Sequence, residues 1–212
     1  DNNSIQPEGK DFYYTDAIGA NAARYIEEAA AAGKPFFGYT AFTSPHWPLH
    51  ALEADVERYK TRYKGGWDAL REERHKKMIR LGLVDRRWPL TPRDPDVPAW
   101  KDAPHKEWEM RRMAVYAAMI DRMDQNVGRI VEALKKTGQF ENTLILMLAD
   151  NGGCAEVLTE KATGLHIPKR TRDGRTVRVG NNPSIPPGHD DDYQSYGIGW
   201  ANASNTPFRR YK

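Results

Sequence analysis

The sequence has a single cysteine, no long apolar run and almost no net charge. One cysteine among 212 residues excludes an internal disulfide framework. There is no run of about 18 apolar residues and no basic-apolar leader, so we expect neither a membrane span nor a signal peptide in this piece. The 32 basic and 29 acidic side chains give a net charge of +3, too little to attract nucleic acid through a global field. Function is therefore sought in particular motifs.

An apolar run at residues 143–148 ends in a short polar loop, Ala149–Gly153. The run predicts a buried strand, and in α/β proteins ligands bind just beyond the carboxyl ends of such strands. Asp150 and Asn151 would there present a carboxylate and a carboxamide, which are hard oxygen donors suited to Ca²⁺ and, as second choice, to Mg²⁺. An ordinary Asp-Asn-Gly turn explains the same residues without a metal. The motif alone leaves both interpretations open.

A second run of strand character, Pro35–Thr43, also ends in a polar loop, Ser44–His50. Two prolines fix φ within this loop and stiffen it, which allows a side chain to be held toward a substrate. His46 is therefore a candidate proton donor. The alternative is that His46 and Trp47 only pack beneath the loop.

Helical periodicity accounts for much of the remaining chain. A helix is predicted from Thr15 to about Ala32, with Gly33 as its stop. Residues 52–83 predict one or two surface helices, and residues 86–104, with five prolines, predict an irregular segment. A long amphipathic helix is predicted from about residue 106 to residue 137.

The segment 156–199 is long and polar, which is typical of a functional or a disordered loop. Its basic side chains could contact an acidic substrate or could simply be solvated; they are Lys169, Arg170, Arg172, Arg175 and Arg178. The acidic run at 190–192, beside His189, has the same two interpretations, a metal site or a solvated loop. Residues 195–212 combine glycine, small polar residues and aromatics, and predict an ordered loop at the site.

Four strings of the sequence resemble the sulfatase family, specifically the arylsulfatases of the alkaline-phosphatase-like superfamily. They are Ala-Phe-Thr-Ser-Pro-His-Trp-Pro-Leu-His-Ala (41–51), Val-Tyr-Ala-Ala-Met-Ile-Asp-Arg-Met-Asp-Gln-Asn-Val-Gly-Arg (115–129), Leu-Ala-Asp-Asn-Gly-Gly (148–153) and Asn-Thr-Pro-Phe-Arg-Arg-Tyr-Lys (205–212). Their order and spacing agree from about Tyr13 to Lys212. The resemblance implies a partial alkaline-phosphatase-like sandwich of the α/β class, with a mostly parallel sheet flanked by helices and incomplete at both ends.

The resemblance also implies a mechanism in which a formylglycine hydrate attacks the sulfur of a sulfate ester. Asp150 and Asn151 would hold Ca²⁺, and Asp150 would also contact the nucleophile. His46 would protonate the leaving oxygen, and Lys212 would bind the sulfate oxygens, so that both residues also bind substrate. His50 is expected only to pack behind the site.

Some family features are missing from the sequence. Formylglycine forms from Cys or Ser in a Cys/Ser-x-Pro-x-Arg string, but neither Cys154 nor Ser184 has the proline and arginine that this string requires. The paired N-terminal aspartates of the calcium site and the Glu-Gly-Gly-Ile-Arg segment are also absent. We therefore expect residues 1–212 to be one partial catalytic domain, an interior piece that lacks the nucleophile and has no activity alone.

The resemblance implies that the intact parent hydrolyses sulfate esters of small molecules or glycans and is periplasmic or secreted. Two alternatives share the same residue types. One is a phosphate or phosphonate monoester hydrolase of the same superfamily, and the other is a binding protein that has kept the fold and lost the nucleophile.

Overall fold

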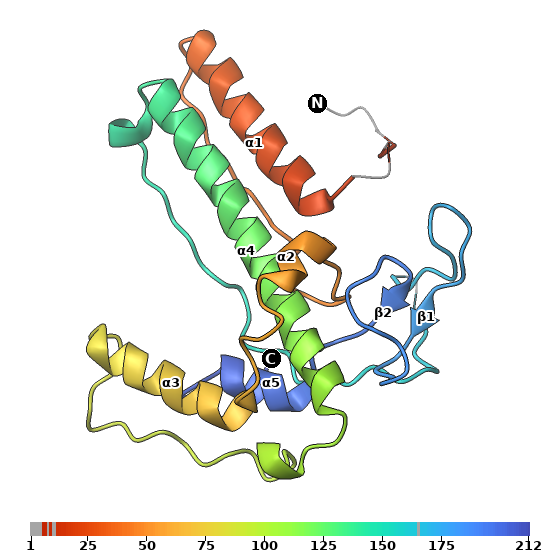
Figure 1. The fold of residues 1–212 in the computed structure, drawn as a ribbon. Helices are drawn as coiled ribbons and strands as arrows, with labels where there is room; N and C mark the ends of the chain where they lie inside the picture. The colour runs from red at the N-terminus through yellow and green to blue at the C-terminus, as the bar shows by residue number, and fades with distance from the viewer. Residues whose placement is uncertain (1–5, 8, 10–11, 165) are drawn as a thin grey trace. The chain divides into compact units, whose positions relative to one another are not determined.

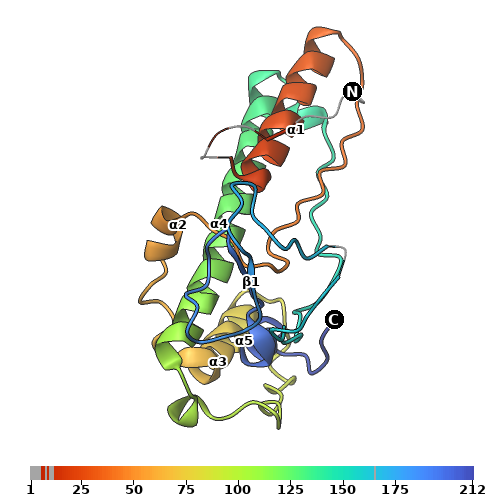
Figure 2. The same ribbon diagram turned by 90° about the vertical axis from the view of Figure 1, so that its right-hand side faces the viewer.

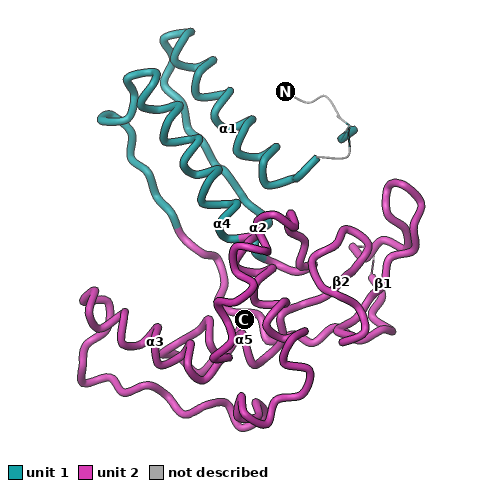
Figure 3. Tube along the Cα trace, in the orientation of Figure 1, with its two compact units in different colours: residues 1–45, 120–147 teal, residues 46–119, 148–212 magenta. Residues whose placement is uncertain are grey.

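The computed structural model describes residues 6–7, 9, 12–164 and 166–212. The chain divides into two compact units, one of residues 1–45 and 120–147 and the other of residues 46–119 and 148–212 (Figure 3). No helix in these described ranges is both long enough and apolar enough to cross a membrane.

The first unit is built from helix α1 (Tyr14–Ala31) and the C-terminal part of α4 (Lys106–Lys136), which lie side by side (Figures 1 and 2). Ile26 of α1 packs against Ala133 and Leu134 of α4. At the other end of the pair, the guanidinium of Arg122 donates to the Asp16 carboxylate, with a shortest N–O distance of 2.6 Å. Both helices have the bounds that periodicity predicts to within two residues.

The two predicted core strands, 35–43 and 143–148, do not form. Both segments run along the first unit as chain without regular secondary structure, and their apolar side chains are open to solvent, with Phe37 94% and Leu144 84% exposed. A strand needs a neighbour that accepts and donates its backbone hydrogen bonds, and the described part of the chain offers these segments none. The apolar runs predicted strands, but a local pattern does not show whether a neighbouring strand is present to pair with them.

Strand structure is limited, within the described residues, to β1 (Arg178–Val179) and β2 (Asp192–Tyr193). They pair in parallel, with Arg178 opposite Asp192 and Val179 opposite Tyr193. The predicted α/β class is therefore confirmed, with a much smaller sheet than expected. Both strands lie inside the segment 156–199 that was predicted to be a loop, of which Leu165 falls outside the described residues.

The second unit holds the larger core, formed by the N-terminal part of α4 and three shorter helices. These helices are α2 (Glu53–Glu57), α3 (Gly66–Arg80) and α5 (Gly197–Ser204), with the 3-10 turns η1 (Trp100–Asp102) in this unit and η2 (Phe140–Asn142) in the other. Helices α3 and α5 pack side by side (Figure 1). Helix α5 replaces part of the loop predicted at 195–212.

Three tryptophans from different elements meet in the core of the second unit. The ring centroid of Trp67 lies 4.7 Å from that of Trp100 and 5.4 Å from that of Trp200, both in edge-to-face geometry. Such aromatic pairs contribute about 0.5–1.5 kcal/mol beyond the area they bury. The cluster joins α3, η1 and α5, and so fixes the helix that precedes residues 205–212.

Gly66 and Gly82 allow the packing of Trp100 to be tested separately from backbone strain. Both have left-handed φ, 68° and 71°, but a Cβ on Gly66 would lie 1.9 Å from the Trp100 ring, whereas a Cβ on Gly82 would meet nothing within 4 Å. We expect Gly82→Ala to lower the free energy of unfolding by about 1–2 kcal/mol through strain alone. Gly66→Ala should lower it by a further ~1–3 kcal/mol, because the core must move to admit the methyl group. Urea unfolding of the two variants checks this, and equal losses would contradict it.

Candidate active site

His46 and Lys212, which are far apart in the sequence, are in direct contact in the second unit. The Lys212 Nζ lies 3.0 Å from the His46 Nε2, and the His46 Nδ1 lies 2.7 Å from the Trp47 carbonyl oxygen. An ammonium can only donate and a carbonyl can only accept. Nε2 must therefore accept from Lys212, and Nδ1 must carry the proton and donate it to the carbonyl. The contact fixes both the ring orientation and the tautomer of His46.

The Asp-Asn-Gly-Gly loop lies against Lys212. The backbone N–H of Lys212 donates to the carbonyl oxygen of Gly153 at 3.2 Å. The N–H of Gly153 donates to the Asn205 Oδ1 at 2.7 Å, and the Asn205 Nδ2 donates to the carbonyl oxygen of Arg210 at 2.7 Å. The predicted proton donor, sulfate-binding lysine and metal-binding loop thus come together, although their roles stay predictions.

Asp150 and Asn151 are exposed and lie just before Gly153 in the sequence. Their oxygens suit a hard cation, but Ca²⁺ takes six to eight oxygen ligands. In the described residues, no group of three or more His, Cys, Asp or Glu side chains could hold a metal. Asp150 and Asn151 therefore fit as part of a ligand set and do not form a complete one.

Trp47 links the histidine loop to the residues that follow the Asp-Asn-Gly-Gly loop. Its Nε1 donates to the Glu156 Oε2 at 2.8 Å and to the Cys154 Sγ at 3.3 Å. Its ring makes an edge contact with Tyr193, with centroids 5.8 Å apart. Burial raises the pKa of the Cys154 thiol, which keeps it protonated and poorly nucleophilic. Cys154 is held in the loop by its contacts with Trp47 and Glu156.

His50 packs behind the loop, at the position expected of it. Its Nε2 lies 2.7 Å from the backbone carbonyl of Asp192, to which it can only donate. Burial lowers the pKa of His50, so that the neutral ring with a protonated Nε2 is favoured.

Two arginines of the segment 156–199 pair with acidic side chains of the same segment. Arg175 forms ion pairs with Asp173 at 2.8 Å and with Asp190 at 2.7 Å, and Arg178 pairs with Asp191 at 2.7 Å. Asp192 is fully buried, and its Oδ2 accepts from the backbone N–H groups of Gly188 and His189. These contacts account for the acidic run without a metal.

A family model described as Sulfatase matches residues 1–205. The chain belongs to the sulfatase family. It is 33% identical over 181 residues to an uncharacterized sulfatase of Schizosaccharomyces pombe, covering 84% of this chain and 31% of that protein. It is 31% identical over 211 residues to an arylsulfatase of Klebsiella aerogenes, covering 95% of this chain and 41% of that protein. The chain thus spans less than half the length of these curated relatives.

Among solved structures, the crystal structure of Ps i-CgsB in complex with k-i-k-neocarrahexaose is similar to this sulfatase chain with a TM-score of 0.46 and 23% sequence identity. The match covers 97% of this chain and 37% of that one.

Sequence reasoning proposed His46, Lys212, Asp150 and Asn151 for the candidate site but gave no role to the residues that hold their loops in place. Asn205 lies inside the string 205–212, and Trp47 inside the string 41–51, but neither was given a role at the site. Pro48 directly after Trp47 and Pro207 two residues after Asn205 indicate ordered loops. The hydrogen-bond partners 52 and 109 residues away along the chain give no local signal.

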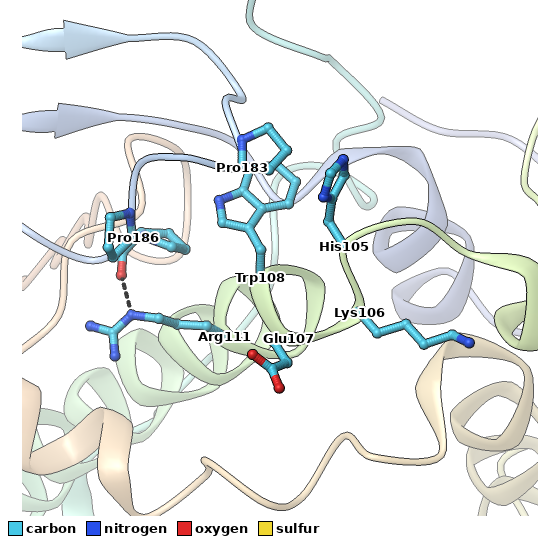
Figure 4. Close-up of a pocket in the computed structure, with 8 residues that line it drawn as sticks. His105, Lys106, Glu107, Trp108, Arg111, Pro183 and Pro186 are labelled. Carbon is cyan, nitrogen blue, oxygen red and sulfur yellow. Dashed lines mark hydrogen bonds between the residues drawn. The ribbon is translucent and has the colours of Figure 1, made fainter.

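A separate cavity of about 520 Å³ opens at the N-terminus of α4 (Figure 4). The Trp108 Nε1 donates to the carbonyl of Ile185 at 3.0 Å, and the Arg111 Nε donates to the carbonyl of Pro187 at 2.9 Å. The lining of this cavity includes none of the predicted site residues. It consists of His105, Lys106, Glu107, Trp108, Arg111, Pro183, Pro186 and Pro187.

Asp192 makes the stability of this sulfatase chain depend on pH. Burial raises its pKa from 3.8 to about 7, while Arg178 acts in the opposite direction and Asp191 in the same one. The unfolded carboxyl ionises first, so its contribution to stability is complete below pH 4 and is lost as the pH rises to about 7. Asp192→Asn should remove this loss, which is at most about 4 kcal/mol because one pKa unit equals about 1.4 kcal/mol.

Urea unfolding of wild type and Asp192→Asn between pH 4.5 and 7.5 measures the difference. The lowered pKa of His50 gives a slope of opposite sign, but His50 is present in both proteins and largely cancels. A difference that stays constant over this range would show that Asp192 is not the source.

Proposed function

We propose that the protein hydrolyses sulfate monoesters, with His46 as the proton donor to the leaving oxygen and Lys212 as the cation that binds the sulfate. The observation that carries this is the 3.0 Å contact between the Lys212 Nζ and the His46 Nε2. A cation and a proton-transfer group meet at one point of the surface, beside the Asp150–Gly153 loop. Membership of the sulfatase family supports the reaction class.

The geometry suits a substrate that enters between the two side chains. A sulfate ester offers only acceptor oxygens on the sulfate and on the bridging position, so it can accept from the Lys212 ammonium and from a protonated Nε2. Binding therefore replaces one hydrogen bond, from Lys212 to His46, with two from the protein to the ester. The Trp47 carbonyl accepts from the Nδ1 proton, so the proton for the leaving oxygen must come from Nε2. Nε2 carries no proton while it accepts from Lys212, so it takes one from solvent once the ammonium has turned to the sulfate, and gives that proton to the leaving oxygen.

The proposed reaction also needs a nucleophile and a metal ion. Formylglycine, which the family resemblance implies, would supply the nucleophile. Ca²⁺ would polarise a sulfate oxygen. Asp150 and Asn151 would provide two of its oxygen ligands, as a carboxylate and an amide. The substrate class proposed is a sulfate ester of a small molecule or glycan.

His46 and Lys212 should respond differently to the leaving group in the whole protein. His46→Ala should reduce kcat/KM by ~10²–10⁴-fold for esters with poor leaving groups and much less for acidic phenols, because only the former need a proton. Lys212→Ala should reduce turnover to a similar extent for all esters, because its charge meets the sulfate itself. A series of substituted phenyl sulfates gives the two slopes.

The controls are His75→Ala, which removes a histidine bonded to the Trp88 carbonyl, and Lys77→Ala, which removes an exposed lysine of α3. Neither should change the slope. Equal slopes for wild type and His46→Ala would exclude His46 as the proton donor. Faster hydrolysis of phenyl phosphates than of phenyl sulfates would favour the phosphate-ester alternative.

Calcium binding should depend on Asp150 in the whole protein and be weak in residues 1–212 alone. Asp150→Asn keeps the shape of the side chain but removes a negative charge, and should weaken Ca²⁺ binding on the order of 100-fold, because ligand charge strongly tunes calcium affinity. Asp124→Asn, an exposed substitution on α4, is the control. Titration calorimetry measures both, and unchanged affinity in Asp150→Asn would remove this residue from the ligand set.

A further inference from the structure

We propose that Asn205 is a positioning residue that fixes Lys212 against the Asp150–Gly153 loop. This inference rests on the proposed function, in which that loop and Lys212 act on the same sulfate group. Asn205 itself does not contact His46 or the Lys212 ammonium in any hydrogen bond that the structure shows. Its effect is to connect the two backbone segments that carry them.

The two ends of the Asn205 side-chain amide bond to two different backbone segments. Its Oδ1 accepts from the Gly153 N–H, and its Nδ2 donates to the Arg210 carbonyl, each at 2.7 Å. Because one partner can only donate and the other can only accept, the amide has a single orientation that satisfies both. The Lys212 N–H then closes the connection by donating to the Gly153 carbonyl at 3.2 Å.

Asn205 is itself held by the end of α5. Its N–H donates to the Ala201 carbonyl at 2.9 Å, and its carbonyl accepts from the Phe208 N–H at 2.7 Å. Ala201 is fully buried in the aromatic core of the second unit. The position of the amide is therefore set by a packed helix, which transmits a fixed geometry to the two loops.

The loop has little room to move toward Asn205. A Cβ on Gly153 would lie 3.2 Å from the Asn205 Oδ1 and 2.8 Å from the Tyr196 hydroxyl. The two side chains thus enclose the Gly153 backbone on this side. Without the amide, Gly153 and Arg210 each lose a partner, and Lys212 remains tied to the loop by one longer hydrogen bond. A displacement of about 1 Å at a reacting group can reduce turnover about 100-fold.

Three variants of the whole protein separate this role from a general loss of stability. Asn205→Ala removes both hydrogen bonds of the side chain. Asn205→Asp keeps an acceptor for the Gly153 N–H but places an oxygen against the Arg210 carbonyl, so it breaks only the hydrogen bond to Arg210. Thr206→Val is the matched control, because it removes the hydrogen bond that the Thr206 hydroxyl donates to the Ala203 carbonyl of α5 and leaves both Asn205 hydrogen bonds in place.

The first measurement is amide hydrogen exchange at Gly153, which needs no catalytic activity. We expect exchange to increase at least ~3-fold in Asn205→Ala and to stay near the wild-type rate in Asn205→Asp, since one hydrogen bond changes an equilibrium by this order. Thr206→Val should leave Gly153 unchanged. Unchanged exchange in Asn205→Ala would overturn the proposal.

The second measurement is turnover of a phenyl sulfate. We expect kcat/KM to fall ~10–100-fold in both Asn205 variants, and Thr206→Val to retain wild-type turnover at an equal or greater loss of thermal stability. Wild-type turnover in both Asn205 variants would overturn the proposal. If the wild-type protein hydrolyses no sulfate ester, the proposed function fails, while the exchange experiment still decides whether Asn205 fixes the loop.

Discussion

The hydrogen bond between the Lys212 N–H and the Gly153 carbonyl is the contact on which the site depends. It joins two segments that are separated by most of the C-terminal third of the chain. One of the two segments contains Asp150 and Asn151, and the other ends in Lys212, whose ammonium contacts His46. Since this bond uses backbone atoms alone, it occupies none of the side-chain groups of Lys212, Asp150 or Asn151.

Two kinds of support hold this contact in place. The tryptophans of α3, η1 and α5 pack edge to face, which sets the position of α5. Trp47 connects the histidine loop to Glu156 and Cys154, just beyond the Asp-Asn-Gly-Gly loop. The tryptophan cluster is apolar, while the connections to the loops are hydrogen bonds. The precision of the site therefore comes from a small number of hydrogen bonds on a rigid base.

The sequence allowed the long helices to be predicted, because helical periodicity is a local pattern. The roles of the site residues came from the family resemblance and stay predictions. Periodicity located α1 and α4, and the string around His46 and the one ending in Lys212 identified the pair that meets. Helix α5 was missed because its two glycines, serine and asparagine have poor helix propensity, and its stability comes from the burial of Trp200. The runs at 35–43 and 143–148 were misassigned because a strand is defined by a neighbour, which no local pattern reveals.

A buried ion pair beneath α5 links two positions in any redesign of this protein. Arg112 pairs with Glu109 at 2.6 Å and also donates to the Ser195 carbonyl, and Trp200 donates to the other oxygen of Glu109 at 3.0 Å. Removing one partner of such a pair leaves a buried charge and costs about 3–5 kcal/mol, whereas an apolar replacement of both can be neutral. The two residues can therefore be exchanged together far more readily than one at a time, and the Trp200 nitrogen and the Ser195 carbonyl would each need a new partner.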